Sequence, residues 1–177
     1  MKISDTAQTN TRNIVLIGVP GAGKTTVGSI LARKLGRDFI DTDQKIEEIS
    51  GKTISEIFIQ DGEAIFRKTE KDVIEQSIAK GNAVISLGGG ALMNSDTREL
   101  VKTQRTIWLQ TGLAQAVDRI GMNRNRPLLL GNVRGQLADL MAAREPFYIE
   151  CAHEVVDTNQ LSADQVADLI VAKLEQG

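Results

Sequence analysis

The sequence has few residues of several kinds, and each shortage argues against a class of protein. A single cysteine, Cys151, occurs among 177 residues, which excludes an internal disulfide framework and a site built from several cysteines. No run of about 18 consecutive apolar residues is present, so we expect no membrane-spanning helix. The 21 basic and 23 acidic residues leave a net charge of −2, which favours neither nucleic acid nor an anionic membrane as a partner. We therefore expect a cytoplasmic monomer that binds small molecules.

The length and the apolar content predict one globular domain. With 41% hydrophobic residues, the chain can bury one substantial core. Residues 1–12 are polar and lack the apolar centre of a signal peptide, so we expect a flexible tail there and a single domain over residues 13–177.

The most informative stretch, Gly18 to Thr25, reads GVPGAGKT and matches the phosphate-loop pattern of Gly, four residues, Gly-Lys and Ser or Thr. A strand is predicted before it over 14–17 and a helix after it over 26–35. Glycines let the backbone turn tightly and direct N–H groups at a phosphate near the helix N-terminus. The pattern predicts a nucleotide site in which Lys24 reaches the β- and γ-phosphates and the Thr25 hydroxyl binds Mg²⁺. The alternative is a glycine-rich turn that binds nothing. The residues assigned to the nucleotide are Gly21, Ala22, Gly23, Lys24, Thr25 and Thr26.

Two carboxylates follow the next predicted strand, which covers residues 37–40. Asp41 and Asp43 lie just past its carboxyl end, the edge at which open α/β sheets bind ligands. Carboxylate oxygens there could support a magnesium ion on the nucleotide phosphates. The alternative is helix capping, in which Thr42 or Asp43 begins the helix predicted over 44–50.

A run of three glycines, Gly88 to Gly90, follows the apolar strand predicted over 83–87. A simple turn needs one or two glycines, so close approach of the backbone to a ligand explains the run better than a flexible linker does. Upstream, helices are predicted over 54–58 and 64–78, and Arg67 lies near the start of the second. A lone arginine on a helix is usually solvated, so Arg67 by itself predicts no site.

The remaining elements complete an alternation of strands and helices. The predicted elements are strands over 106–109 and 154–156 and helices over 95–102, 113–120, 133–144 and 162–174. Ser95 and Ser162 are expected to cap the first and last of these helices. Trp108 is expected in the core. Five strands separated by helices predict an α/β fold, with a mainly parallel sheet between two helical layers.

A basic segment over about 121–133 contains Arg124 and Arg126. A lid over polyphosphate would carry such arginines, because closure excludes water and guanidinium groups neutralise phosphate charge. A solvated surface loop is the alternative.

Two absences narrow the class of phosphate-loop protein. The sequence lacks the Asn-Lys-x-Asp motif that reads guanine, which argues against a GTPase. The strand over 83–87 is followed by glycines, whereas a hydrolysing ATPase usually has an acidic pair there. These observations favour phosphoryl transfer to a bound small molecule.

Taken together, these motifs resemble the shikimate kinase family over residues 13–174. The resemblance rests on GVPGAGKT, FIDTDQ, GEAIFR, SLGGGA, NRPLL, REPFY and VDTN, in this order along the chain. It implies a phosphate-loop fold of the nucleoside-monophosphate-kinase type with a five-stranded parallel sheet and a lid. It also implies transfer of the ATP γ-phosphate to the 3-hydroxyl of shikimate, giving shikimate 3-phosphate and ADP in aromatic amino-acid biosynthesis.

The resemblance further implies roles for individual residues. Lys24, Asp43 and Arg126 would be catalytic: Lys24 and Arg126 on the phosphates, and Asp43 on the attacking hydroxyl. Asp41 would support Mg²⁺ together with Thr25.

The two ligands of the implied reaction would meet other residues as well. Arg67 and Arg144 would clamp the substrate carboxylate, a task that suits the planar guanidinium fork. The backbone of Gly88, Gly89 and Gly90 would line the substrate, and Arg119 and Asn159 would lie near adenine.

Two other functions are open at this point. A kinase for another small polyol acid, such as gluconate, would share the loop and the fold, but the two arginines with the glycine run fit a ring carboxylic acid better. A nucleotide-binding regulator without catalysis is the second alternative, and the presence of Lys24, Thr25, Asp41, Asp43 and Arg126 argues against it.

Overall fold

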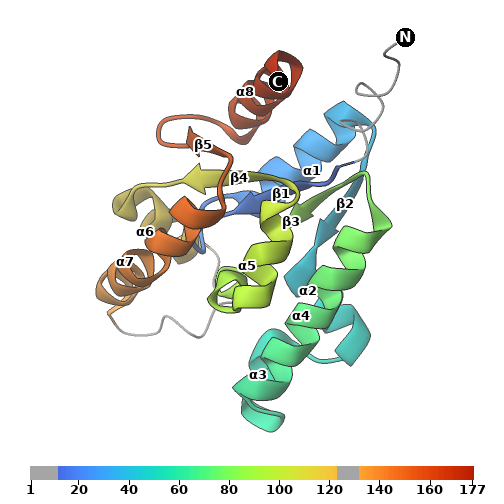
Figure 1. The fold of residues 1–177 in the computed structure, drawn as a ribbon. Coiled ribbons are helices and arrows are strands. Elements are labelled where there is room, and N and C mark those ends of the chain that lie inside the picture. The colour runs from blue at the N-terminus through green and yellow to red at the C-terminus, as the bar shows by residue number, and fades with distance from the viewer. Residues whose placement is uncertain (1–11, 123–131) are drawn as a thin grey trace.

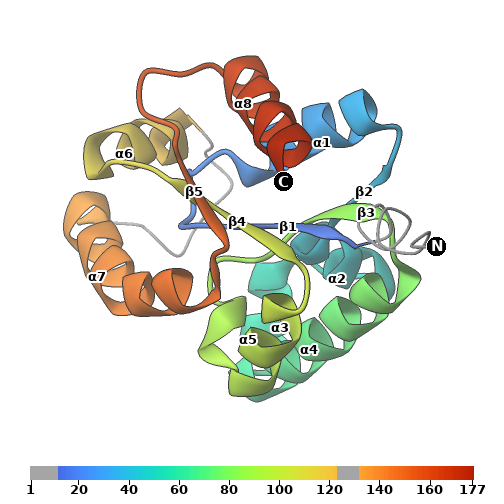
Figure 2. The same cartoon turned by 45° about the horizontal axis from the view of Figure 1, so that its top comes forward.

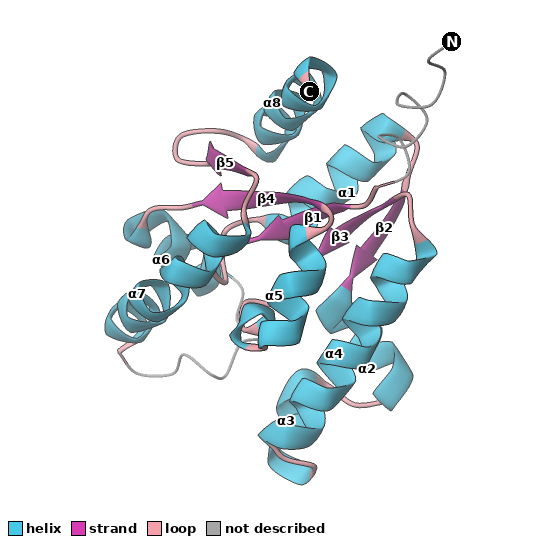
Figure 3. Ribbon diagram, in the orientation of Figure 1, coloured by secondary structure: helices cyan, strands magenta, loops and turns pink. Residues whose placement is uncertain are grey.

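A five-stranded parallel sheet forms the centre of the protein, seen in a computed structural model that describes residues 12–122 and 132–177. The strand order is β2-β3-β1-β4-β5, so β1 lies in the middle of the sheet (Figure 3). The strands are β1 (Ile14–Ile17), β2 (Asp38–Asp41), β3 (Ala83–Ser86), β4 (Arg105–Gln110) and β5 (Glu154–Asp157). The predicted parallel α/β fold is confirmed.

Helices cover both faces of this sheet. They are α1 (Lys24–Leu35), α2 (Thr42–Ser50), α3 (Ile54–Gln60), α4 (Glu63–Lys80), the 3₁₀ helix η1 (Ala91–Met93), α5 (Ser95–Lys102), α6 (Leu113–Met122), α7 (Val133–Cys151) and α8 (Ala163–Gln176). One face carries α1 and α8 side by side, and the other carries α4, α5 and α7 (Figure 1, Figure 2). Within the described ranges, no helix is long and apolar enough to cross a membrane.

The central strands read as continuous apolar runs because both of their faces are covered. All four residues of β1 and of β3 are buried. Trp108 of β4 is also buried and belongs to the same core, as the sequence predicted.

One predicted helix cap and one predicted helix end are wrong. The cap of α5 is Asn94, whose Oδ1 accepts a hydrogen bond from the Thr97 N–H at 3.1 Å, so the expected cap Ser95 is already the first helical residue. Helix α7 continues through Pro146 to Cys151, beyond the predicted end at 144. Proline removes one helical hydrogen bond, but burial of Tyr148 and Cys151 in the core stabilises the turns that follow it.

Candidate active site

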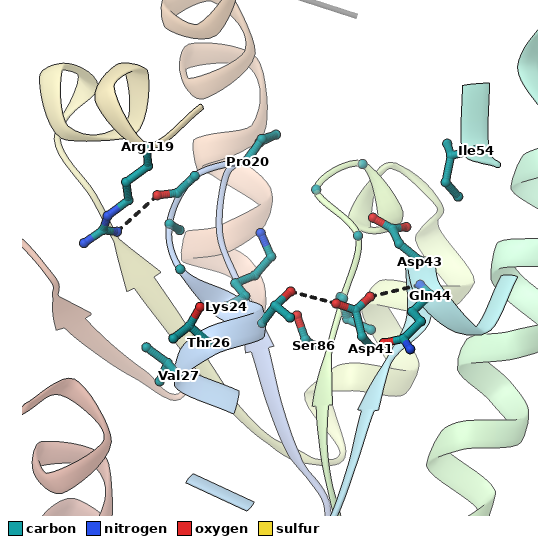
Figure 4. A pocket seen from close by; sticks show the side chains of 18 of the residues that line it. Pro20, Lys24, Thr26, Val27, Asp41, Asp43, Gln44, Ile54, Ser86 and Arg119 are labelled. Carbon is teal, nitrogen blue, oxygen red and sulfur yellow. Dashed lines mark hydrogen bonds between the residues drawn. The ribbon is translucent and has the colours of Figure 1, made fainter. Parts of the chain in front are cut away.

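A cavity of about 1190 Å³ opens at the carboxyl ends of β1, β2 and β3 (Figure 4). It is lined by most of the residues that the sequence predicted: the loop over 21–26, the aspartates Asp41 and Asp43, the glycines 88–90, and Arg67, Arg119 and Arg144. The predicted residues Arg124 and Arg126 lie outside the described residues. Segments far apart in the sequence thus meet in one cavity, because parallel strands end at the same edge of the sheet.

The phosphate loop connects β1 to α1 with a backbone that requires glycine. Gly21 and Gly23 have φ values of 83° and 88°, a backbone region that residues other than glycine rarely adopt. Gly23 is also the residue before α1, so the loop ends at a helix N-terminus, where backbone N–H groups and the helix dipole favour a phosphate. Lys24 Nζ donates to the carbonyl oxygens of Gly18 at 2.7 Å and Val19 at 3.0 Å. These bonds hold the ammonium group against the loop.

Asp41 joins the phosphate loop to α2. One carboxylate oxygen, Oδ2, accepts a hydrogen bond from the Thr25 hydroxyl at 2.7 Å, and the other, Oδ1, accepts one from the Gln44 N–H at 3.1 Å (Figure 4). Asp41 therefore caps α2, and the alternative in which Thr42 or Asp43 is the cap is wrong. The cap is the last residue of β2, because the helix starts immediately where the strand ends.

The chemistry of this pair fits magnesium. Hydroxyl and carboxylate oxygens are hard donors, and Mg²⁺ in nucleotide sites is usually held by one or two protein ligands together with phosphates and water. Among the described residues, no group of three or more histidines, cysteines or acids forms a separate metal site. Thr25 and Asp41 are thus the group that fits such an ion.

Gly88 brings its backbone against Asp43, which lies in the first turn of α2. A β-carbon at Gly88 would lie 2.6 Å from Asp43 Oδ1, closer than real β-carbons approach other atoms. The Thr42 hydroxyl fixes this approach, since it donates to Ser86 O and accepts from the Gly88 N–H, both at 3.2 Å. The absence of a side chain at Gly88 is therefore what allows Asp43 its position.

The next two glycines each face one of the two predicted arginines. A β-carbon at Gly89 would lie 3.0 Å from Arg144 Nη1, and one at Gly90 would lie 2.7 Å from Arg67 Nη2. Three successive glycines thus each lie against a different side chain predicted for the site. The sequence led us to expect close approach of this backbone to a ligand. The structure shows close approach to side chains of the protein itself, and the contact with a ligand stays a prediction.

Glu70 is a site residue that the sequence prediction missed. Its side chain is buried on α4, and its Oε1 lies 2.9 Å from Arg67 Nη1 in a hydrogen-bonded ion pair. Burial raises the pKa of Glu70, Arg67 opposes this shift, and the nearby Asp43 carboxylate adds to it. One signal was present: Glu70 follows Arg67 by three residues and precedes Val73 by three, so it lies on the apolar face of the helix.

The two residues predicted near adenine have different surroundings. Arg119 lines the cavity, and its Nη1 donates to Gly21 O at 3.1 Å (Figure 4). Asn159 accepts a hydrogen bond from the Gly112 N–H at 3.0 Å and is not itself a lining residue, whereas Thr158 and Leu161 on either side are. The arrangement thus brings Arg119, and the neighbours of Asn159, to the cavity.

The comparison with known families agrees with this geometry. The model of the shikimate kinase family matches residues 20–175. The chain belongs to the shikimate kinase family. The shikimate kinase of Thermobifida fusca is 45% identical over 160 residues, covering 90% of this chain and 93% of that relative. The shikimate kinase of Symbiobacterium thermophilum is 43% identical, covering 93% and 97%.

Solved structures lead to the same family. Shikimate kinase from Acinetobacter baumannii, in complex with shikimate, matches with a TM-score of 0.91 at 38% identity and covers 96% of each chain. Deoxyadenosine kinase from M. mycoides, at 21% identity and a TM-score of 0.62, shares the fold alone. The predicted resemblance is confirmed, and with it the assignment of the chain as an ATP-dependent small-molecule kinase of the shikimate pathway.

Proposed function

We propose that the chain transfers the γ-phosphoryl group of ATP to the 3-hydroxyl of shikimate through the residues that line this cavity. The observation that carries the proposal is the convergence of three kinds of group: a phosphate loop, a carboxylate, and two arginines packed on a glycine run. The phosphate loop suits the phosphate donor, the carboxylate suits the acceptor hydroxyl, and the two arginines suit the acceptor carboxylate.

On the donor side, the phosphate loop and Lys24 would hold the β- and γ-phosphates. Lys24 begins α1, and its ammonium group already lies against the loop. Thr25 and Asp41 would hold Mg²⁺, which neutralises phosphate charge when it is bound. Arg119 donates to the backbone of the same loop, which supports a place for it beside the nucleotide.

On the acceptor side, Arg67 and Arg144 would bind the shikimate carboxylate from two helices, α4 and α7. Each packs on a different glycine of the same loop, so their separation is set by backbone. Glu70 orients Arg67 through its ion pair. A guanidinium held in this way loses less conformational freedom when it binds a carboxylate.

Asp43 would orient the attacking hydroxyl and accept its proton. The transition state of phosphoryl transfer is loose, with little bond formation to the nucleophile, so alignment matters more than basicity. Packing of Gly88 against Asp43 supports this role because it restricts the carboxylate. Arg126 would add charge near the transferred group; its part in the proposal rests on the sequence motif alone.

The remaining parts of the proposal concern the protein in the cell. We propose a cytoplasmic monomer that requires Mg²⁺ and binds neither nucleic acid nor membranes. The single cysteine and the balanced charge support this view. Light scattering would test the oligomeric state, and chelation of divalent ions would test the metal requirement.

The decisive experiment is an ADP-release assay with Mg²⁺ and ATP and one of three additions: shikimate, gluconate, or no acceptor. We expect release with shikimate only. Release with gluconate would support the polyol-acid alternative, and release without acceptor would indicate an ATPase. ATP binding without release under any condition would support a regulator that lacks catalysis.

A further inference from the structure

Tyr148 is the only tyrosine of the chain, and it lies buried beneath the acceptor side of the cavity. Its hydroxyl donates to Gly89 O at 3.3 Å. Its ring packs at a tilt against Trp108 of β4, with 5.6 Å between ring centroids. The core thus fixes the ring, and the ring presents a hydroxyl to the middle glycine of the run.

The residue that Tyr148 holds is the one where the donor and acceptor loops meet. A β-carbon at Gly89 would lie 3.0 Å from Arg144 Nη1 and 3.2 Å from Cδ of Pro20 in the phosphate loop. Arg144 itself precedes Tyr148 by one helical turn on α7 and interacts with the same hydroxyl. One buried side chain therefore bonds to the Gly89 backbone and lies near the Arg144 guanidinium that packs on it.

We propose that Tyr148 is a positioning residue for shikimate, which holds Gly89 and Arg144 in a fixed arrangement for the substrate carboxylate. The inference rests on the proposed function, because it takes Arg144 as a carboxylate ligand. Tyr148 itself is 2% exposed, so it acts through these two groups and does not contact the substrate.

The electrostatics of the site suit this role. Burial raises the pKa of Tyr148 to about 12, although Arg144 lowers it, so the hydroxyl keeps its proton at neutral pH and remains a donor. A neutral phenol orients Arg144 without cancelling its charge. Arg67, in contrast, is oriented by the Glu70 carboxylate. The two arginines thus differ in the group that orients them: a neutral phenol for Arg144 and a carboxylate for Arg67.

The first test is the variant Tyr148→Phe, which keeps the ring against Trp108 and removes only the hydroxyl. We expect KM for shikimate to rise about 5- to 10-fold, the factor that loss of one hydrogen bond gives, while KM for ATP stays within about 2-fold. Thr106→Val is the matched control, because the buried Thr106 hydroxyl donates to Val101 O at 2.6 Å away from the cavity. Unchanged KM for shikimate in Tyr148→Phe, or an equal rise in both KM values, would overturn the inference.

Arg144→Ala separates this inference from the proposed function. If that variant leaves KM for shikimate unchanged, the carboxylate clamp is wrong. If it raises KM but Tyr148→Phe does not, the clamp stands and only the positioning role fails. We expect Tyr148→Phe to raise KM for shikimate by a smaller factor in an Arg144→Ala background than in the parent. In that background, Tyr148 has already lost one of the two groups that it holds.

A second measurement works on the folded protein without a substitution. Because Tyr148 is the only tyrosine, biosynthetic 3-fluorotyrosine labels this position alone. We expect saturating shikimate to shift the ¹⁹F resonance, and to shift it less in the Arg144→Ala variant at saturation. A resonance that does not respond to shikimate would contradict the proposal, even if Tyr148→Phe failed to fold.

Discussion

Replacement of Gly88 by alanine should displace Asp43 and reduce turnover strongly. The new β-carbon would lie 2.6 Å from Asp43 Oδ1, and an ordinary contact begins at 3.4 Å, so the carboxylate must move by about 0.8 Å. Asp43 has a short side chain that begins in the first turn of α2, so a shift of this size takes its carboxylate out of the position that it holds in the site. A displacement of about 1 Å in a reacting group can cost about 100-fold in rate, so we expect kcat to fall by about 10- to 100-fold.

Steady-state kinetics with shikimate and ATP measures this effect, and two other glycines provide controls. Gly121→Ala adds a β-carbon on α6 with no atom of the described residues within 4 Å, and it should leave kcat unchanged. Gly90→Ala brings a β-carbon to 2.7 Å from Arg67 Nη2, but the end of an arginine side chain is flexible. It should therefore raise KM for shikimate modestly and change kcat little. Full activity of Gly88→Ala would refute the conclusion that this glycine positions Asp43.

Four further predictions test other parts of the site. Arg67→Ala should raise KM for shikimate at least about 10-fold with little change in KM for ATP, as loss of a charged hydrogen bond predicts; equal kinetics to the parent would contradict the clamp. Arg126→Ala should lower kcat by about 100-fold or more, as for other arginines that stabilise phosphoryl transfer, and full kcat would make it a surface residue. Burial raises the pKa of Glu70 in the folded state, so folding disfavours its ionised form relative to the unfolded chain, and its contribution to stability falls as pH rises above about 4.5. The free energy of unfolding in urea should therefore rise for Glu70→Gln relative to the parent as pH increases from about 4.5 to 7. A difference between the two proteins that does not change with pH would refute this. Burial raises the pKa of the Cys151 thiol to about 11, so a thiol reagent should modify it slowly at pH 7 in native protein and rapidly in urea.

Much of the donor side could be predicted because its signals are local. The phosphate loop is a contiguous motif with a strand before it and a helix after it, and both flanking elements are visible in the apolar pattern. The ends of the next two strands were predicted in the same way at residues 40 and 87, each one residue from the observed ends at Asp41 and Ser86. Parallel strands then bring these ends together with no further information.

Features that depend on contacts across the fold could not be predicted in this way. The place of Glu70 on the apolar face of α4 was the one signal in the sequence, and it did not reveal that the side chain is buried beside Arg67. The cap at Asp41 depends on α2 starting where β2 ends, and the sequence allowed Thr42 or Asp43 equally well. Continuation of α7 through Pro146 depends on the buried contacts of later residues, which local propensity does not contain.

The glycine run also explains where the acids of this site are found. A hydrolysing ATPase usually has an acidic pair after the strand equivalent to β3, but here a side chain at Gly88 would meet two carboxylates, with its β-carbon 2.6 Å from Asp43 and 3.1 Å from Glu70. A third carboxylate at this position would clash and would add like charge to a region in which the Glu70 pKa is already raised. The acids are instead supplied by α2 and α4, which leaves the end of β3 as bare backbone. Because β3 pairs with β1, that backbone lies directly beside the phosphate loop, at the contact between Gly89 and Pro20. If the acceptor binds on the glycine run as proposed, it would lie adjacent to the phosphate donor, which is the arrangement that direct transfer requires.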